Sequence, residues 1–256
     1  LQRTSLEIPI KVVGTGCPGF CECGPLVTID PEQISYQRVQ PKDVTDIVQQ
    51  TLLDGKVIDR LLYRDSLTGE LIEHEPDLPF YSKQKRMLLD LNGRTDPTRI
   101  QDYIVMGGYH SLVKALSGMR PGEVIAEVKA SGLRGRGGAG FPTGLKWELC
   151  SKHVEKARDG FIICNADEGD PGAFMDRSVM EGNPHSVLEG MLIGAFAIGV
   201  KTGYVYIRAE YPLAVQNLRL AIRQAEQAGL LGSNILGTGF NCQLHVRLGA
   251  GAFVCG

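Results

Sequence analysis

One loop decides the interpretation of this chain, and it has the sequence GRGGAGFPTGLKW at residues 135–147. Five of its first ten residues are glycine, which has no Cβ and lets backbone N–H groups lie against a ligand. Successive N–H groups in such turns form concave sites that hold phosphate. Arg136 and Lys146 add positive charge, and Phe141 offers a flat face to an aromatic ring. The loop therefore predicts a nucleotide-binding site.

The glycine spacing alone does not identify a dinucleotide fold. Gly135, Gly137 and Gly140 match G-x-G-x-x-G, but that fingerprint requires a strand before it and a helix after it. Residues 123–130, which precede the loop, have the apolar spacing of a helix. A standard Rossmann turn is therefore not expected, and a plain flexible loop stays open as the alternative, because glycine clusters also mark turns.

Length and composition narrow the class of protein. A chain of 256 residues indicates one or two domains, and a net charge of −2 argues against a nucleic-acid partner. No apolar run approaches the roughly 18 residues that span a membrane, and no secretory signal pattern occurs. Seven cysteines without such a signal indicate a reducing compartment. We therefore expect a cytoplasmic protein, free or within a membrane-associated complex.

The order of apolar and polar segments predicts three parts. They are a first unit at residues 1–63, a proline-bearing linker at 64–97 and an α/β domain at 98–256. In the first unit we expect strands at 8–13 and 26–29, a helix at 41–53 and a strand or extended tail at 57–63. In the α/β domain we expect helices at 100–106, 109–116, 122–130, 186–200 and 211–228, and strands at 161–164, 204–208 and 243–248. Strands that alternate with helices predict a sheet covered by helices. The sequence stops within a glycine-rich segment, so we expect this domain to be incomplete at its C-terminal end.

Two further motifs follow expected strands. The first is the acidic turn, NADEGDPGAF at residues 165–174. It carries an amide at Asn165 and carboxylates at Asp167, Glu168 and Asp170. Ligand groups in α/β sheets usually stand at the carboxyl ends of strands, where these side chains could bond ribose hydroxyls or a flavin ring. A solvated acidic turn and a Mg²⁺ site are the alternatives. The second motif is LGAGAFVCG at residues 248–256, which suits a close backbone approach or simple tight packing.

A cysteine cluster lies near the start of the chain. Cys17 and Cys21 form a Cys-x₃-Cys pair in a glycine-rich loop, which suits half of an iron–sulfur or zinc site. Two ligands alone cannot complete a four-sulfur site. Cys23 is expected to be a bystander, and the remaining cysteines have no metal-ligand spacing. The five histidines form no cluster and are expected to be structural or surface residues.

The three long motifs, in this order, resemble one family. It is the NADH-oxidising, FMN-binding subunit shared by respiratory complex I, by bidirectional and electron-bifurcating hydrogenases, and by NAD-linked formate dehydrogenases. The segments EGNPH at 181–185, RAEY at 208–211 and GTGF at 237–240 fit the same family. The resemblance covers residues 104–256. It implies a Rossmann-like FMN and NADH domain that is not a true dinucleotide fold.

The resemblance also implies roles for residues. Lys146 would neutralise FMN, Phe141 would stack on the NADH adenine, and Glu168 and Asp170 would shape the nicotinamide position and the flavin electronics. Asn165, Asp167 and Glu168 would bond the isoalloxazine or ribityl group. The remaining residues expected to line the pocket are Gly135, Arg136, Gly137, Gly138, Ala139, Gly140, Gly144, Gly249, Gly251 and Phe253.

This sequence departs from the respiratory members of the family at three of these places. Asp170 stands where they have glutamate, Phe253 where they often have tyrosine, and Leu149 where a second adenine-stacking aromatic can occur. The shorter carboxylate and the missing hydroxyl bear on nucleotide affinity and on the choice between NADH and NADPH. They leave the class of reaction unchanged.

The first unit resembles the C-terminal half of a thioredoxin-like [2Fe–2S] ferredoxin, with Cys17 and Cys21 as the second ligand pair. By the resemblance, NADH transfers a hydride to FMN, and electrons then pass singly to iron–sulfur clusters of a hydrogenase- or dehydrogenase-type complex. The ligands of the nearest [4Fe–4S] cluster would lie beyond Gly256. The alternatives are a non-catalytic relay or assembly subunit that keeps the fold, and a zinc- or ligand-binding module without a redox role.

Overall fold

The computed structural model describes residues 10–136, 138–157 and 159–251. The chain divides into two compact units. The first contains the chain up to Val13 and Cys17–Asp90. The second contains Gly14–Gly16 and the chain from Leu91 onward.

The first unit is built from short elements around small apolar clusters. Two antiparallel pairs form its sheets, β1 (Val27–Ile29) with β2 (Ile34–Tyr36) and β3 (Tyr63–Arg64) with β4 (Leu71–Ile72). The helical segments are η1 (Cys21–Cys23), η2 (Pro41–Asp43), α1 (Val44–Asp46), the π-type η3 (Ile47–Leu53), η4 (Asp59–Leu61), η5 (Glu75–Asp77) and α2 (Pro79–Ser82). Tyr36 is fully buried, and its hydroxyl lies 2.7 Å from Thr51 Oγ1 and accepts the Ile58 N–H.

The structure confirms some expectations for this unit and corrects others. The helix at 41–53 and the strand at 26–29 are present. The strand expected at 8–13 is wrong for residues 10–13, which pair with no strand and leave Val12 82% exposed. The strand or tail expected at 57–63 is wrong over η4, because the buried Ile58, Leu61 and Leu62 have helical spacing. Within the stretch expected as a linker, β3, β4, η5 and α2 are folded, and Leu78 and Tyr81 are buried.

The second unit contains a parallel sheet with the order β5 (Ile162–Ala166), β6 (Thr202–Arg208) and β7 (Gln243–Gly249). Helices α7 (Met175–Gly182) and α8 (Pro184–Ile198) connect β5 to β6, and α9 (Pro212–Gln227) and η6 (Ile235–Gly237) connect β6 to β7. Before the sheet come α3 (Ile100–Val105), α4 (His110–Gly118), α5 (Pro121–Ala130) and α6 (Thr143–Ala157). Each helix and strand expected in this unit is confirmed, with ends within two residues of those expected, so the α/β class is correct.

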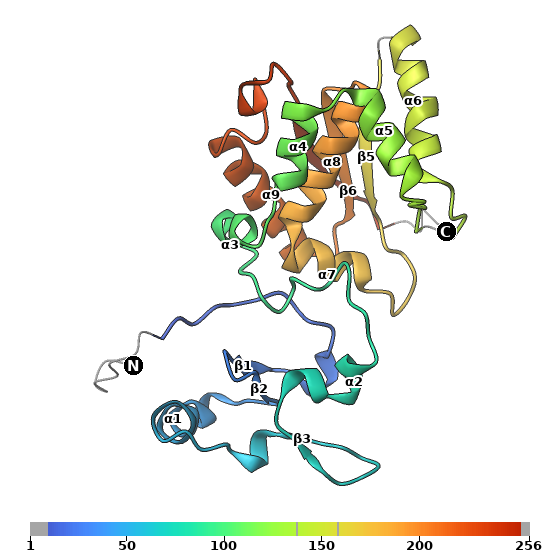
Figure 1. Cartoon of the computed structure of the whole chain (residues 1–256). Helices are drawn as coiled ribbons and strands as arrows, with labels where there is room; N and C mark the ends of the chain where they lie inside the picture. Colours follow the sequence, from blue (N-terminus) through green and yellow to red (C-terminus); the bar gives the residue numbers. More distant parts are fainter. Residues whose placement is uncertain (1–9, 137, 158, 252–256) are drawn as a thin grey trace. The chain divides into compact units, whose positions relative to one another are not determined.

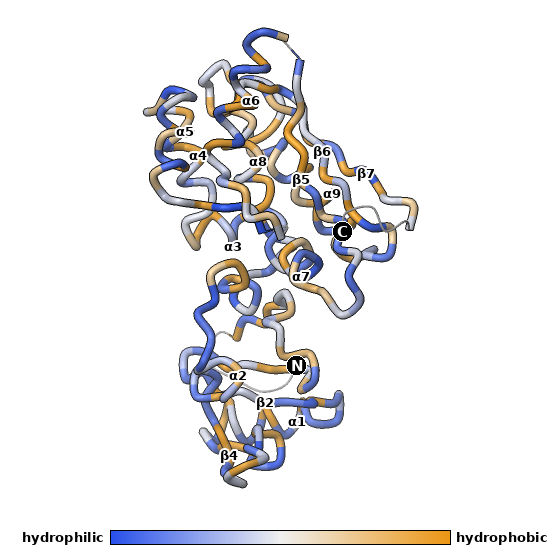
Figure 2. The backbone as a smooth tube through the Cα atoms, turned by 90° about the vertical axis from the view of Figure 1, so that its right-hand side faces the viewer, coloured by the Kyte–Doolittle hydropathy of each residue, from blue (hydrophilic) through white to orange (hydrophobic). Residues whose placement is uncertain are grey.

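The helices form layers on one side of the sheet. Helix α8 is apolar through most of its length and packs against the sheet, α9, α4, α5 and α6 (Figures 1 and 2). Inward residues such as Val205 and Ile207 on β6 are fully buried, whereas Ile163 on the opposite face of β5 is 63% exposed. The described residues therefore cover one face of the sheet and leave the other open.

A buried polar network joins the helices of this core. The Glu189 carboxylate on α8 accepts the Tyr103 hydroxyl at 2.6 Å and the backbone N–H groups of Tyr109 and Leu112. The Tyr109 hydroxyl lies 2.9 Å from His185 Nδ1. Within the described part of the chain, no helix is both long and apolar enough to cross a bilayer.

Candidate functional site

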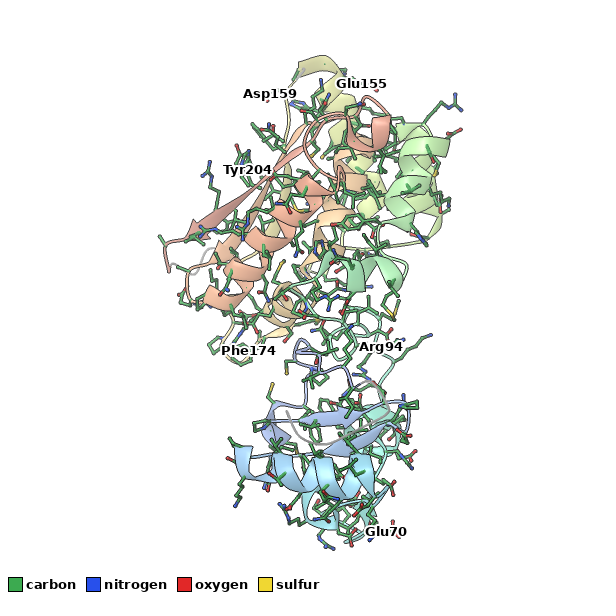
Figure 3. All side chains as sticks on the ribbon, turned by 90° about the vertical axis from the view of Figure 1, so that its left-hand side faces the viewer. Glu70, Arg94, Glu155, Asp159, Phe174 and Tyr204 are labelled. Carbon is green, nitrogen blue, oxygen red and sulfur yellow. The ribbon has the colours of Figure 1, made fainter. Side chains whose placement is uncertain are left out.

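The carboxyl edge of the parallel sheet brings three sequence motifs together. Strand β5 ends at Ala166 beside Ile207 of β6, and Arg208 of β6 pairs with Gly249 of β7. The segments that leave the three strands are therefore the acidic turn, the RAEY motif and the turn through Gly251. Figure 3 shows Tyr204 on the sheet and Phe174 on the acidic turn.

The glycine loop stands at the start of α6. Because α6 precedes β5 and runs back along it, the first turn of α6 lies at the same end of the sheet as the carboxyl end of β5 (Figure 1). A helix N-terminus favours anions through its unpaired N–H groups and its dipole. The topology therefore places the N-terminus of α6 and the acidic turn at the same end of the sheet.

Hydrogen bonds close the loop at its base. The Gly135 N–H donates to the Phe141 carbonyl at 2.8 Å, and the Thr143 N–H donates to the Leu133 carbonyl at 2.9 Å. The Arg134 Nε donates to the Gly140 carbonyl at 2.6 Å. Within the described residues, the backbone N–H groups of Gly138 and Ala139 at the tip have no hydrogen-bond partner. A loop that is fixed at its base and presents N–H groups at its tip fits an oxyanion.

The side chains around the loop are open to a ligand. Arg136 and Lys146 are exposed, and neither has an ion-pair partner in the described part of the chain. The Phe141 ring is 46% exposed. Gly137 lies outside the described residues.

Gly144 differs from the other loop glycines because helix packing leaves no room for a side chain there. It is buried in the first turn of α6, where an added Cβ would lie 2.6 Å from the backbone nitrogen of Lys129 on α5. Close packing of two helices therefore requires glycine here.

Asp167 is the most unusual group of the acidic turn. It is only 8% exposed, and its Oδ2 is buried without a hydrogen-bond partner among the described residues. Its backbone N–H donates to Asn165 Oδ1 at 3.1 Å, which fixes the turn, and Asn165 itself is exposed. A buried acceptor that lacks a donor is costly. This atom therefore marks a place where a ligand donor fits.

Glu168 is engaged by the protein. Its two carboxylate oxygens accept the backbone N–H groups of Asp176 at 3.0 Å and Arg177 at 3.1 Å, at the start of α7. A carboxylate at this position satisfies unpaired helix N–H groups and the helix dipole. Burial, and secondarily the Glu168 charge, raise the pKa of the Asp176 carboxyl. The Asp170 carboxylate, in contrast, is exposed and makes no hydrogen bond or ion pair within the described residues.

Arg208 and Tyr211 hold the acidic turn from the neighbouring strand. Arg208 Nη1 donates to the Glu168 carbonyl at 2.8 Å, and the Tyr211 hydroxyl donates to the same oxygen at 3.2 Å. Arg208 Nη2 donates to Glu210 Oε1 at 3.0 Å and holds the pKa of the Glu210 carboxyl below its usual range. Both residues belong to the RAEY motif, but only the register of the sheet shows which groups their side chains reach.

Gly249 at the end of β7 and Gly251 just beyond it lie close to side chains of β6 and of the RAEY motif. A Cβ on Gly249 would lie 3.3 Å from the Tyr206 hydroxyl, and a Cβ on Gly251 would lie 3.7 Å from Glu210 Oε1. Gly251 has φ +77°, where a side chain is strained. Phe253 lies outside the described residues.

The cysteine pair belongs to the first unit. Cys17 Sγ and Cys21 Sγ lie 3.1 Å apart, and no group of three or more potential metal ligands forms among the described residues. A [2Fe–2S] cluster requires four ligands, and these two sulfurs would be half of that number. In the second unit, burial raises the pKa of the Cys164 and Cys242 thiols to about 12, as expected for inert buried cysteines.

Comparisons with known proteins agree on one family. The family model described as the Nuo51 FMN-binding domain matches residues 128–256. The NADP-reducing hydrogenase subunit HndC of Solidesulfovibrio fructosivorans is 56% identical over 174 residues, which are 68% of this chain and 35% of that protein. A subunit of the NADH-quinone oxidoreductase of Rhizobium meliloti is 50% identical over 157 residues, which are 61% of this chain and 37% of the relative.

A solved structure supports the same assignment. The NAD⁺-reducing [NiFe]-hydrogenase in its air-oxidised state aligns with 94% of this chain and 36% of its own chain, at a TM-score of 0.51 and 26% identity. The chain thus spans little more than a third of the length of these relatives.

Proposed function

Because the chain belongs to the Nuo51 FMN-binding domain family, we propose that its second unit is the Rossmann-like NADH and FMN module of a larger redox complex. It would act there as an NAD(H):acceptor oxidoreductase, in a hydrogenase- or dehydrogenase-type assembly with iron–sulfur subunits as partners. A cytoplasmic location, free or within a membrane-associated complex, is part of this proposal. When bound, FMN supplies the chemistry, because its ring can take a hydride from NADH and release electrons singly.

The glycine loop and α6 would bind the phosphate end of the nucleotides. The N–H groups of Gly138 and Ala139, the α6 N-terminus and the Lys146 ammonium all favour an anion. Phe141 would provide an apolar face for the adenine. By the family resemblance, Arg136, Gly137 and Phe253 would complete the pocket, together with the backbone at Gly135, Gly140, Gly249 and Gly251.

The acidic turn would bind the uncharged, hydrogen-bonding part of the ligand. Asn165 and Asp167 can accept from a flavin ring N–H or from ribityl hydroxyls. The Asp170 carboxylate is exposed and would act beside the nicotinamide, whereas Glu168 would act through its contacts with α7. Gly144 would contribute through the packing of α6 against α5 rather than through direct contact.

The buried, unpartnered Oδ2 of Asp167 is the observation that carries this proposal. A carboxylate loses favourable hydration when it is buried, and a hydrogen-bond donor offsets part of that loss. The acidic turn, the RAEY motif and the turn through Gly251 leave the same edge of the sheet, and a nucleotide bound at that edge would supply such a donor. A solvated acidic turn would not bury its carboxylate in this way.

For the first unit we propose a partial thioredoxin-like ferredoxin in which Cys17 and Cys21 are one ligand pair of a [2Fe–2S] cluster. The observation in its favour is the convergence of the two sulfurs. The other two ligands would have to come from outside the described residues. The nearest [4Fe–4S] cluster would likewise use ligands that this sequence does not contain.

NADH-dependent dye reduction tests the proposal for the second unit. The chain is reconstituted with FMN, freed of excess cofactor and assayed with NADH and with NADPH. Asp167→Asn should lower the activity at least several-fold, whereas the matched control Asp159→Asn on an exposed loop should not. Stoichiometric FMN without any nicotinamide-dependent activity would instead favour the non-catalytic relay subunit.

A further inference from the structure

Strand β7 lies at an edge of the parallel sheet, and one of its sides is unpaired. In the described part of the chain, β6 is the only strand that pairs with it (Figure 2). The Gln243 N–H donates to the Lys201 carbonyl beside β6 at 2.9 Å, whereas the N–H and C=O of Cys242 bond Gly232 on the other side. Alternate residues of a strand turn these backbone groups to opposite sides. The groups that point away from β6 are therefore those of Leu244, Val246 and Leu248.

This edge lacks the usual protection against pairing. Natural edge strands are blunted by lysine, proline or a bulge, or are covered by other segments. Strand β7 has the sequence QLHVRLG, without lysine or proline, and its register with β6 is unbroken. Among the described residues, no hydrogen bond reaches the outward backbone groups of Leu244, Val246 and Leu248. An extended segment could therefore add to the sheet here.

A groove lined by two arginines runs beside this edge, between α9 and β7. It has a volume of about 360 Å³, and no carboxylate lines it. Arg219 and Arg223, one turn apart on α9, are exposed and form no hydrogen bond or ion pair within the described residues. The lining also includes Pro212 at the start of α9 and Leu248, which is 48% exposed. The groove is therefore apolar at one end and positively charged along α9.

The opposite face of β7 is also basic. Arg247 is exposed there, and its guanidinium lies 5.5 Å from the centre of the Tyr204 ring. Side chains of an added strand would alternate between the two faces, so carboxylates on either face would meet an arginine. A second copy of this chain, paired edge to edge, fits less well, because its Arg219 and Arg223 would lie against those of the first.

We propose that the outer edge of β7 and the groove beside α9 bind an extended acidic segment of a partner protein, which adds to the sheet as a further strand. Two carboxylates at alternate positions of that segment would pair with Arg219 and Arg223. The spacings agree, because four residues of a helix rise about 6 Å and two residues of a strand about 6.6 Å. An apolar side chain would occupy the Leu248 end of the groove. This surface has no part in the proposed NADH and FMN chemistry.

Binding of a synthetic peptide to the whole chain tests the charge pairing. The fluorescein-labelled peptide has one leucine and two glutamates at alternate positions, with threonine between them, and fluorescence anisotropy measures its affinity. The double variant Arg219→Ala, Arg223→Ala should bind it roughly tenfold more weakly, as expected for two exposed ion pairs. The control of equal charge is Lys83→Ala, Lys85→Ala, which changes two exposed lysines of the first unit and should leave the affinity unchanged.

Two N-methylated peptides test the backbone pairing without any change in the protein. One has methyl groups on the backbone nitrogens of the leucine and the glutamates, and the other on those of the threonines. Since only one side of an added strand faces β7, one of these peptides should lose binding and the other should keep it. In hydrogen exchange followed by NMR, the unmodified peptide should slow the amides of Leu244, Val246 and Leu248.

Four results would overturn the proposal. The first two are no saturable binding of the peptide by the parent chain and equal affinity in the double arginine variant. The third is the same response to both N-methylated peptides, which would mean attraction by charge without an added strand. The fourth is a dimer in sedimentation experiments in which the three outward amides are protected without peptide, which would assign the edge to a second copy of the chain.

Discussion

The guanidinium of Arg208, at the end of β6, donates to the backbone carbonyl of Glu168 beyond the end of β5, with 2.8 Å between Nη1 and the oxygen. Tyr211 donates to the same carbonyl. Two side chains from one strand and the segment that follows it therefore fix the turn that leaves the neighbouring strand. The Glu168 side chain in turn binds the start of α7, so strand, turn and helix are held as one piece.

Loss of one of these donors should move the turn without unfolding the unit. We expect Tyr211→Phe to weaken FMN binding by roughly tenfold, which corresponds to about 1.4 kcal/mol, the usual size of one net hydrogen bond. Arg208→Lys should act similarly, because a lysine ammonium lacks the planar pair of donors with which the guanidinium reaches both the Glu168 carbonyl and the Glu210 carboxylate. Flavin fluorescence titrations measure the affinity. Arg219→Lys, on the exposed side of α9, is the control, and equal affinities in all variants would contradict a positioning role.

Asp167→Asn should have opposite effects on stability and on binding. The change removes a buried charge whose Oδ2 has no donor among the described residues, so the ligand-free chain should gain on the order of 1 kcal/mol of unfolding free energy. Binding of FMN should weaken, because the ligand loses a charged acceptor. Urea unfolding with and without FMN measures both quantities. Destabilisation of the ligand-free chain would mean that Asp167 serves the fold instead.

His185 should make the second unit less stable in mild acid. Burial lowers the pKa of the His185 imidazole from its usual 6.5, and Nε2 lies 3.0 Å from Gln224 Oε1. Below about pH 6.5 the unfolded chain binds a proton that the folded chain does not, so stability falls until the folded-state pKa is reached. Above both pKa values this residue adds no pH dependence.

The variant His185→Gln checks that expectation. The slope of unfolding free energy against pH should flatten below about pH 6.5 in this variant, whereas His153→Gln on the exposed side of α6 should keep the slope of the parent. An unchanged slope in His185→Gln would assign the acid sensitivity to other groups.

Two helical glycines should respond in opposite directions to alanine. Gly144→Ala places a Cβ against the backbone of Lys129 and should cost about 1–3 kcal/mol through overpacking. Gly190 is exposed on α8, with nothing within 4 Å of an added Cβ, so Gly190→Ala should stabilise the chain by about 0.5–1 kcal/mol. Thermal unfolding of both variants measures the difference. Equal effects would mean that α6 is not packed closely on α5.

Much of the second unit could be predicted because its signals are local. The apolar runs of β5 and β6 and the long apolar stretch of α8 are visible within each segment alone. All three elements form where they were expected. Helix α6 escaped prediction because it begins inside the glycine loop and carries few apolar residues. In the first unit, α2 packs in a small cluster with residues distant in sequence such as Phe20, so periodicity alone does not predict it. Helix η4 is a single turn, which is too short for a periodic pattern to stand out.

In the candidate site, too, local features could be predicted and contacts between distant segments could not. The glycine loop, the acidic turn and the order of motifs could be identified from residue types. The capping of α7 by Glu168 and the bonds from Arg208 and Tyr211 could not, because they depend on which strand ends lie side by side. The sequence also does not show that Gly144 is required by helix packing, whereas Gly138 lies at the open tip of the loop.

Anaerobic titration of the FMN-loaded chain with NADH is the most direct test of the central claim. We predict that one FMN binds per chain, that NADH bleaches its absorbance, and that Lys146→Ala weakens FMN retention while Lys156→Ala at the far end of α6 does not. A chain that binds no FMN, or a bound flavin that NADH leaves oxidised, would contradict the account.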